Sequence, residues 1–188
     1  MENISSPDFL KKLKEDSVQI SGGIRELRSL SDKQLNWKPD ERSWSVGQCI
    51  DHINNTDRPY FDRIKAAFSK AKNFTDSYNY RAAFPGTFLI KAMSPGSKVK
   101  VKAQKIFRPS MSAVSKEAFD RYDKQQEEML AVLEEGKKYN INKIKVSSPA
   151  FSLMRMRVGD ALRVLVLHRR RHLEQAKRIM SMEGFPSS

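Results

Sequence analysis

The chain has 188 residues, of which 39% are hydrophobic and 30% are charged, with 8 Gly and 8 Pro. This composition is typical of one folded domain and excludes collagen, low-complexity sequence and wholesale disorder. No apolar run approaches the roughly 20 residues that a membrane-spanning helix needs, and residues 1–7 do not resemble a secretory signal. The single cysteine, Cys49, excludes an internal disulfide and a cysteine-rich zinc module. We therefore expect a soluble, cytoplasmic, single-domain protein over residues 1–188, with flexible ends at 1–6 and 185–188.

The charge balance is strongly basic, because 35 Lys and Arg residues stand against 22 Asp and Glu residues, a net charge of +13. Such a balance is compatible with a nucleic acid, an acidic membrane surface or an anionic small molecule, and also with basic residues that are simply solvated. The chain has no zinc finger, no aromatic RNA-binding strand and no long basic block. We therefore expect neither a nucleic acid nor a membrane as the main partner.

Helical periodicity begins near the start of the chain. The spacing of apolar residues predicts a first helix from about Pro7 to Ser29, with Ser6 as its N-cap. After a turn-rich link, a second helix is predicted from Ser45, its cap, to about Ala71. Pro59 lies in the middle of this helix, so we expect a kink or a break there.

A long irregular stretch follows, over about Lys72 to Met111, and is predicted to carry the chain along the bundle as a crossover. Within it, Val99 and Val101 alternate with lysines in a pattern that also fits a short strand. A third helix is predicted over about Ser115 to Glu135 and a fourth over about Met156 to Met182. The fold class predicted from these elements is all-α: a four-helix bundle with a long crossover between helices 2 and 3.

The three histidines of the chain are His52, His168 and His172. The last two are four residues apart on the fourth helix and continue its apolar seam from Leu165 to Ala176, so both are expected to face the core. His52 can turn inward from the second helix. An imidazole buried without partners costs on the order of 1–3 kcal/mol, so inward histidines need hydrogen bonds or a metal. Three imidazoles would match the ligand number of a catalytic zinc site, although hydrogen-bonded structural histidines remain the alternative.

Two segments carry a family resemblance. Residues 44–53, which read WSVGQCIDHI and follow LNWKP at 35–39, resemble the DinB-like superfamily, as does HRRRHLEQAKRI at 168–179. The resemblance implies a four-helix bundle that binds a divalent metal ion, usually zinc or nickel, through His52, His168 and His172. It extends loosely over most of the chain and implies a homodimer.

The same resemblance implies a function. Some members of the superfamily are metal-dependent S-transferases or isomerases that use a low-molecular-weight thiol such as bacillithiol or mycothiol. The leading hypothesis is therefore a metal-dependent hydrolase or transferase that transfers such a thiol to an electrophilic small molecule. A non-catalytic metal-binding or stress-related dimeric module is the alternative, and nucleic-acid binding a less favoured one. No catalytic triad or phosphate-binding glycine loop is present, so no catalytic residue is assigned.

Several neighbours of the histidines are further candidates. Cys49, one turn before His52, is expected to pack as a small hydrophobe, and Trp37 and Trp44 to cover the end of the bundle. Thr56 and Tyr60 lie one and two turns beyond His52 and are expected to fill core or kink positions.

Charged residues near the histidines and in the crossover are the last group of candidates. Asp51 and Glu174 are expected to be solvated, because adjacent helix positions face different ways, and Asp57 is a further neighbouring carboxylate. The crossover carries four lysines that are expected to be solvated, with a basic rim for an anionic thiol as the alternative: Lys98, Lys100, Lys102 and Lys105.

Overall fold

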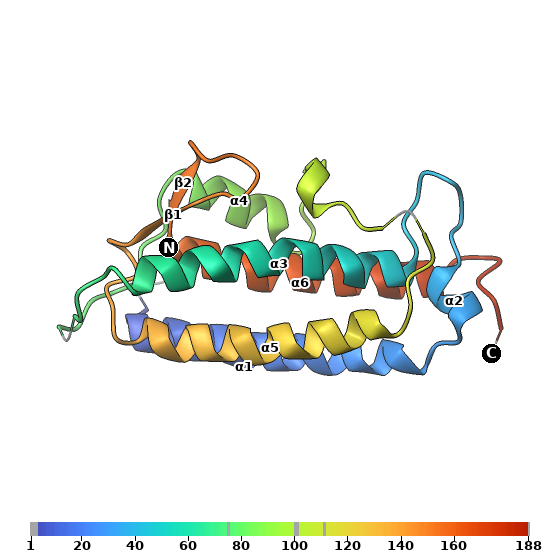
Figure 1. Cartoon of the computed structure of the whole chain (residues 1–188), viewed down its shortest axis with the longest axis horizontal. Helices are drawn as coiled ribbons and strands as arrows, with labels where there is room; N and C mark the ends of the chain where they lie inside the picture. The colour runs from blue at the N-terminus through green and yellow to red at the C-terminus, as the bar shows by residue number, and fades with distance from the viewer. Residues whose placement is uncertain (1–3, 75, 100–101, 111, 188) are drawn as a thin grey trace.

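The structure, a computed structural model, describes residues 4–74, 76–99, 102–110 and 112–187. Within these residues, four long helices pack as a bundle: α1 (Ser6–Glu26), α3 (Val46–Phe68), α5 (Glu117–Gly136) and α6 (Val158–Met180). Each of α1 and α3 contacts both α5 and α6, and Figure 1 shows α1 and α5 on one side with α3 and α6 on the other. The predicted all-α four-helix bundle is confirmed.

The helix starts follow local capping chemistry. The α1 helix begins one residue earlier than predicted, because the hydroxyl of Ser5, rather than that of Ser6, accepts a hydrogen bond from the backbone N–H of Asp8. Ser45 caps α3 as predicted, and its side chain and that of Gln48 form a reciprocal capping box.

Of the kink or break predicted at Pro59, the break is absent, since α3 continues through the proline. Proline removes one backbone hydrogen bond from the interior of a helix, which costs about 3 kcal/mol. On both sides of it the helix is anchored in the core by buried side chains, including Ile53, Tyr60 and Ile64. Packing of this face outweighs the local cost of the proline.

The connections contain more regular structure than the sequence analysis predicted. The 31–43 link holds α2 (Asp32–Asn36), preceded by the 3-10 turn η1 (Leu27–Ser29), and the crossover holds α4 (Gly86–Met93) and the 3-10 turn η2 (Lys105–Phe107). Between α5 and α6, β1 (Lys145–Ser147) and β2 (Arg155–Arg157) pair antiparallel, with Val146 opposite Met156. Val99 lies outside any strand, and Lys100, Val101 and Met111 lie outside the described residues.

Four of these connecting elements, α4, η2, β1 and β2, cover one side of the bundle. The α4 helix and β2 contact α6, η2 contacts α3, and β1 contacts both. Figure 1 shows them together above α3 and α6, on the side away from α1 and α5. None of the helices in the described ranges is long and apolar enough to span a membrane.

Candidate metal centre

The structure brings the three histidines together at one point of the bundle. His168 and His172 lie one turn apart on α6, and His52 faces them from α3; all three are buried. The Nε2 atom of His168 is 3.0 Å from that of His52 and 3.1 Å from that of His172. One potential ligand atom from each residue lies within 4.8 Å of the others. The expectation of inward-facing imidazoles is therefore met by geometry.

The outer nitrogens of two of these rings are hydrogen-bonded. The Nδ1–H of His52 donates to the carbonyl oxygen of Phe107, and the Nδ1–H of His172 donates to Oε1 of Gln175 at 3.0 Å. In a neutral imidazole the nitrogen that carries no proton is the acceptor. Both bonds therefore turn an Nε2 lone pair towards the centre, as outer hydrogen bonds do for metal-binding histidines. Trp44 packs against His52 and His172, with ring centroids 4.7 and 5.7 Å away.

Burial keeps the three rings neutral. Loss of hydration lowers the pKa of His52, and it lowers the pKa of His168 well below its usual value. The same cause, with the nearby imidazole of His52, lowers the pKa of His172 to about 3. Neutral imidazole is the form that binds a metal ion.

The donor set fits a divalent metal ion. The Nε2 lone pairs of His52 and His168 face each other at 3.0 Å and repel unless a proton or a cation lies between them. The other ring nitrogen of His168, Nδ1, has no hydrogen-bond partner in the described part of the chain. Two nitrogens that are each about 2.1 Å from one ion, at angles between roughly 90° and 109°, are about 3.0–3.4 Å apart. The observed separations of 3.0 and 3.1 Å lie in this range.

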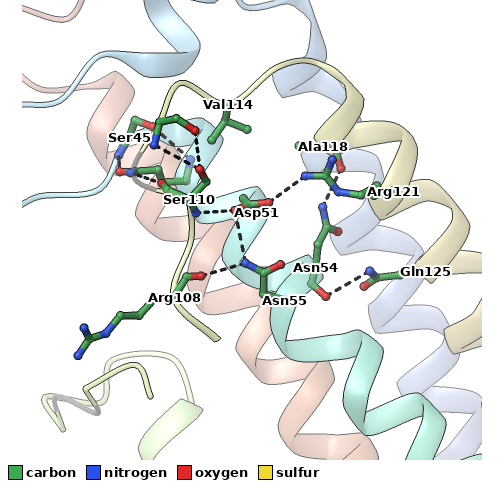
Figure 2. A network of polar contacts seen from close by, with 12 residues as sticks. Ser45, Asp51, Asn54, Asn55, Arg108, Ser110, Val114, Ala118, Arg121 and Gln125 are labelled. Atoms are coloured by element: carbon green, nitrogen blue, oxygen red, sulfur yellow. Dashed lines mark hydrogen bonds and ion pairs between the residues drawn. The ribbon is translucent and has the colours of Figure 1, made fainter. Parts of the chain in front are cut away.

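A clamp between α3 and the end of the crossover positions His52. Oδ2 of Asp51 accepts a hydrogen bond from the backbone N–H of Ser110 at 2.8 Å, and Oδ1 of Asp51 pairs with Arg121 at 2.9 Å. The side chain of Asn55 donates to the carbonyl of Arg108 at 3.0 Å. Figure 2 shows Ser110, Arg121 and Asn55 in contact with Asp51, and Asn55 also in contact with Arg108. They hold residues 108–110 against α3, and so they hold the carbonyl of Phe107 next to His52.

The prediction that Asp51 is solvated is wrong, because its side chain is buried and paired with Arg121. Within the described part of the chain, the side chain of Asp51 forms no hydrogen bond with a histidine. Its partners come from the crossover and from α5, which is why the sequence of α3 alone did not reveal its role. Glu174, by contrast, is half-buried and takes no part in the histidine cluster.

A cavity of about 820 Å³ includes the three histidines in its wall. Thr56, Tyr60 and Trp44 also line it, together with residues of the crossover and of the 148–154 loop. The hydroxyl of Thr56 donates a hydrogen bond to the backbone oxygen of His52. The hydroxyl of Tyr60 lies 3.4 Å from that of Ser148. The cavity is large enough for a small organic molecule.

The charged groups in the cavity wall share one sign. Among the described residues that line it, no Asp or Glu is found, whereas four carry positive charge: Arg42, Lys102, Arg171 and Arg178. Of the crossover lysines, Lys98 and Lys105 are exposed and do not line the cavity, and Lys100 lies outside the described residues. The field in this cavity therefore favours an anionic ligand.

Two further candidates have packing roles. Cys49 is completely buried, burial raises the pKa of its thiol to about 12, and it takes no part in the histidine cluster. Trp37 packs edge-on against Phe185 at the end of the bundle. Trp44, predicted to cover the same end, forms part of the cavity wall.

A buried ion pair that was not predicted from the sequence lies beside the site. Nε of Arg169 is 2.6 Å from Oδ2 of Asp57, and neither side chain is exposed. The same guanidinium donates to Oε1 of Gln126 and to the hydroxyl of Ser17, so it links all four bundle helices. The spacing of residues in α6 could have predicted the burial of Arg169, because Arg169 lies four residues after the buried Leu165 on the core-facing side of the helix.

The fold and the site together place this protein among four-helix bundles whose interior holds a group of three histidines that could bind a metal ion. The sequence profile of the DinB superfamily matches residues 24–176, a span that contains all three histidines, so the chain belongs to this superfamily. No curated protein and no solved structure gives a significant match to the chain.

Proposed function

We propose that the protein is a metal-dependent enzyme that transfers a low-molecular-weight thiol to an electrophilic small molecule. The observation that carries this proposal is the convergence of His52, His168 and His172 in the wall of a cavity of about 820 Å³. A structural histidine cluster needs no such cavity, whereas a reaction needs space for substrate beside the reacting centre.

The three Nε2 atoms would hold a divalent ion, with zinc or nickel as the expected metal. Such an ion would supply positive charge that lowers the pKa of a thiol or a water molecule bound to it. Phe107 and Gln175 fix the orientation of two of the rings through their Nδ1 atoms. Trp44 covers the same two rings and limits the access of water to that side.

The remaining residues of the cavity would select and orient the substrates. Arg42, Lys102 and Arg178 favour a thiol that carries carboxylate groups, because the described lining offers no acidic side chain to repel it. Apolar side chains such as Leu89 and Met154 provide a surface for the electrophile. A homodimer and a cytoplasmic location, both expected from the sequence, stay predictions.

Metal analysis of the purified protein tests the site. We expect about one equivalent of divalent metal per chain, and loss of that metal from His52→Ala, His168→Ala and His172→Ala. Tyr60→Phe, which changes a polar group in the same cavity without touching the histidines, is the control and keeps its metal. Unchanged metal content in any of the histidine variants would contradict the three-ligand site.

Turnover needs its own measurement, because a bound metal need not be catalytic. We expect conjugation of a thiol from a panel of low-molecular-weight thiols to an alkyl halide or epoxide, and its loss on chelation. Arg178→Gln should raise the KM for a carboxylate-bearing thiol and leave that for neutral 2-mercaptoethanol unchanged. Turnover that survives complete metal removal would refute the mechanism. Stoichiometric metal without turnover for any thiol would instead favour the non-catalytic module.

A further inference from the structure

The excess positive charge of the chain is concentrated in two segments. Residues 81–108 and 143–157, here called the cap, contain 11 Lys and Arg residues and no Asp or Glu. The rest of the chain is almost balanced, with 24 basic and 22 acidic residues. The cap holds α4, η2 and the β1–β2 hairpin, which lie together on the α3 and α6 side of the bundle (Figure 1).

The basic side chains of the cap are available to a partner. Nine of those that the structure describes are exposed: Arg81, Lys91, Lys98, Lys102, Lys105, Arg108, Lys143, Lys145 and Arg155. Among the described residues, none of these nine forms an ion pair. By contrast, basic residues of α1 and η1 pair with acidic residues of α5 on the opposite face, as Arg25 does with Asp123 and Arg28 with Asp120.

The same surface exposes apolar side chains. In the described ranges, six of the eight exposed large hydrophobic residues belong to the cap: Phe84, Phe88, Val99, Ile106, Phe151 and Leu153. Leu153, in the loop of the hairpin, is 97% exposed, and Ile106 in η2 is 55% exposed. Protruding apolar side chains among unpaired cations are unusual on a surface that faces only water.

We propose that the cap is a docking surface for an anionic lipid bilayer. Cations near an anionic leaflet are attracted to it, and apolar tips gain by entering the boundary between headgroups and acyl chains. The most exposed of the six, Leu153, is aliphatic and suits lipid, because nucleic-acid bases would stack on aromatic rings such as those of Phe84 and Phe88 and gain little from Leu153. A peripheral contact needs no spanning helix, so this proposal revises the expectation of no membrane partner. It does not depend on the proposed enzymatic function.

Sedimentation with lipid vesicles tests the proposal on the full chain. We expect binding to vesicles of equal parts phosphatidylcholine and phosphatidylglycerol, weakening with added salt, and little binding to phosphatidylcholine alone. Leu153→Ser should lower the affinity about tenfold, whereas Val18→Ser, which alters an exposed apolar residue of α1, should not change it. Lys105→Gln with Lys145→Gln should cost about fivefold per lysine, and Lys11→Gln with Lys124→Gln, on α1 and α5, much less.

The outcomes separate the proposal from its alternatives. Neither Leu153, Ile106, Lys105 nor Lys145 lines the cavity, so all variants should keep the circular dichroism spectrum, thermal midpoint and metal content of the wild type. Absence of binding to the anionic vesicles would overturn the proposal, as would equal losses in the cap variants and their controls. Binding to single-stranded RNA that competes with vesicles and is indifferent to Leu153→Ser would assign the cap to a nucleic acid instead.

Discussion

Removal of the buried guanidinium of Arg169 is expected to destabilise the bundle strongly. Arg169→Met keeps most of the side-chain length but deletes the cation 2.6 Å from Oδ2 of Asp57, together with the bonds to Gln126 and Ser17. Breaking one partner of a fully buried ion pair costs about 3–5 kcal/mol, because the other charge stays buried without compensation. For a chain of this size, each kcal/mol shifts the thermal midpoint by about 2–4 °C, so we expect a fall of about 6–20 °C.

The neighbouring arginine provides a matched control on the same helix. Arg170 pairs with Asp16 at 2.8 Å, but both side chains are about one-third exposed. Water screens such a pair, so Arg170→Met should cost about 0–1 kcal/mol. Thermal melts followed by circular dichroism, with chelator present to remove any metal contribution, compare the two variants directly.

A double variant tests the reason for the loss. In Asp57→Leu with Arg169→Met, no charge remains buried, and apolar replacements of a buried ion pair are often neutral or stabilising. We therefore expect the double variant to recover most of the stability that Arg169→Met loses. A double variant as unstable as Arg169→Met, or a single variant within 1 kcal/mol of the wild type, would refute the buried-charge argument.

Two further predictions concern the histidine cluster. Because burial lowers the pKa of the three imidazoles below their unfolded value of about 6.5, the unfolded state binds more protons, and metal-free stability should fall as the pH drops from about 7 to 5. Denaturant titrations with chelator measure this slope, which should be shallower in His168→Gln; a flat profile in the wild type would contradict it. Gln175→Ala, which removes the acceptor for Nδ1 of His172, should weaken metal affinity roughly 10–100-fold in competition with a chelating dye, whereas Glu174→Ala should match the wild type.

The amino-acid sequence by itself determined the bundle and the composition of the candidate site. Apolar residues at three- and four-residue intervals predicted the four long helices to within a few residues, because one helix face must be buried whatever it packs against. Ser45 was identified as a cap from local chemistry alone. The four-residue spacing placed His168 and His172 on one face, and the match of residues 24–176 to the DinB superfamily supports the same assignment of fold.

Only the tertiary structure decided how distant segments meet. The clamp on Asp51 joins α3 to the crossover and α5, and the ion pair of Arg169 with Asp57 joins α6 to α3; such contacts depend on helix rotation and register that periodicity does not encode. The short elements α4 and β1–β2 also form where the bundle offers a surface to cover, because pieces this short gain most of their stability from packing. The enclosure of the three imidazoles and the gathering of basic and apolar residues on one side also depend on how distant segments meet, so they became visible only in three dimensions.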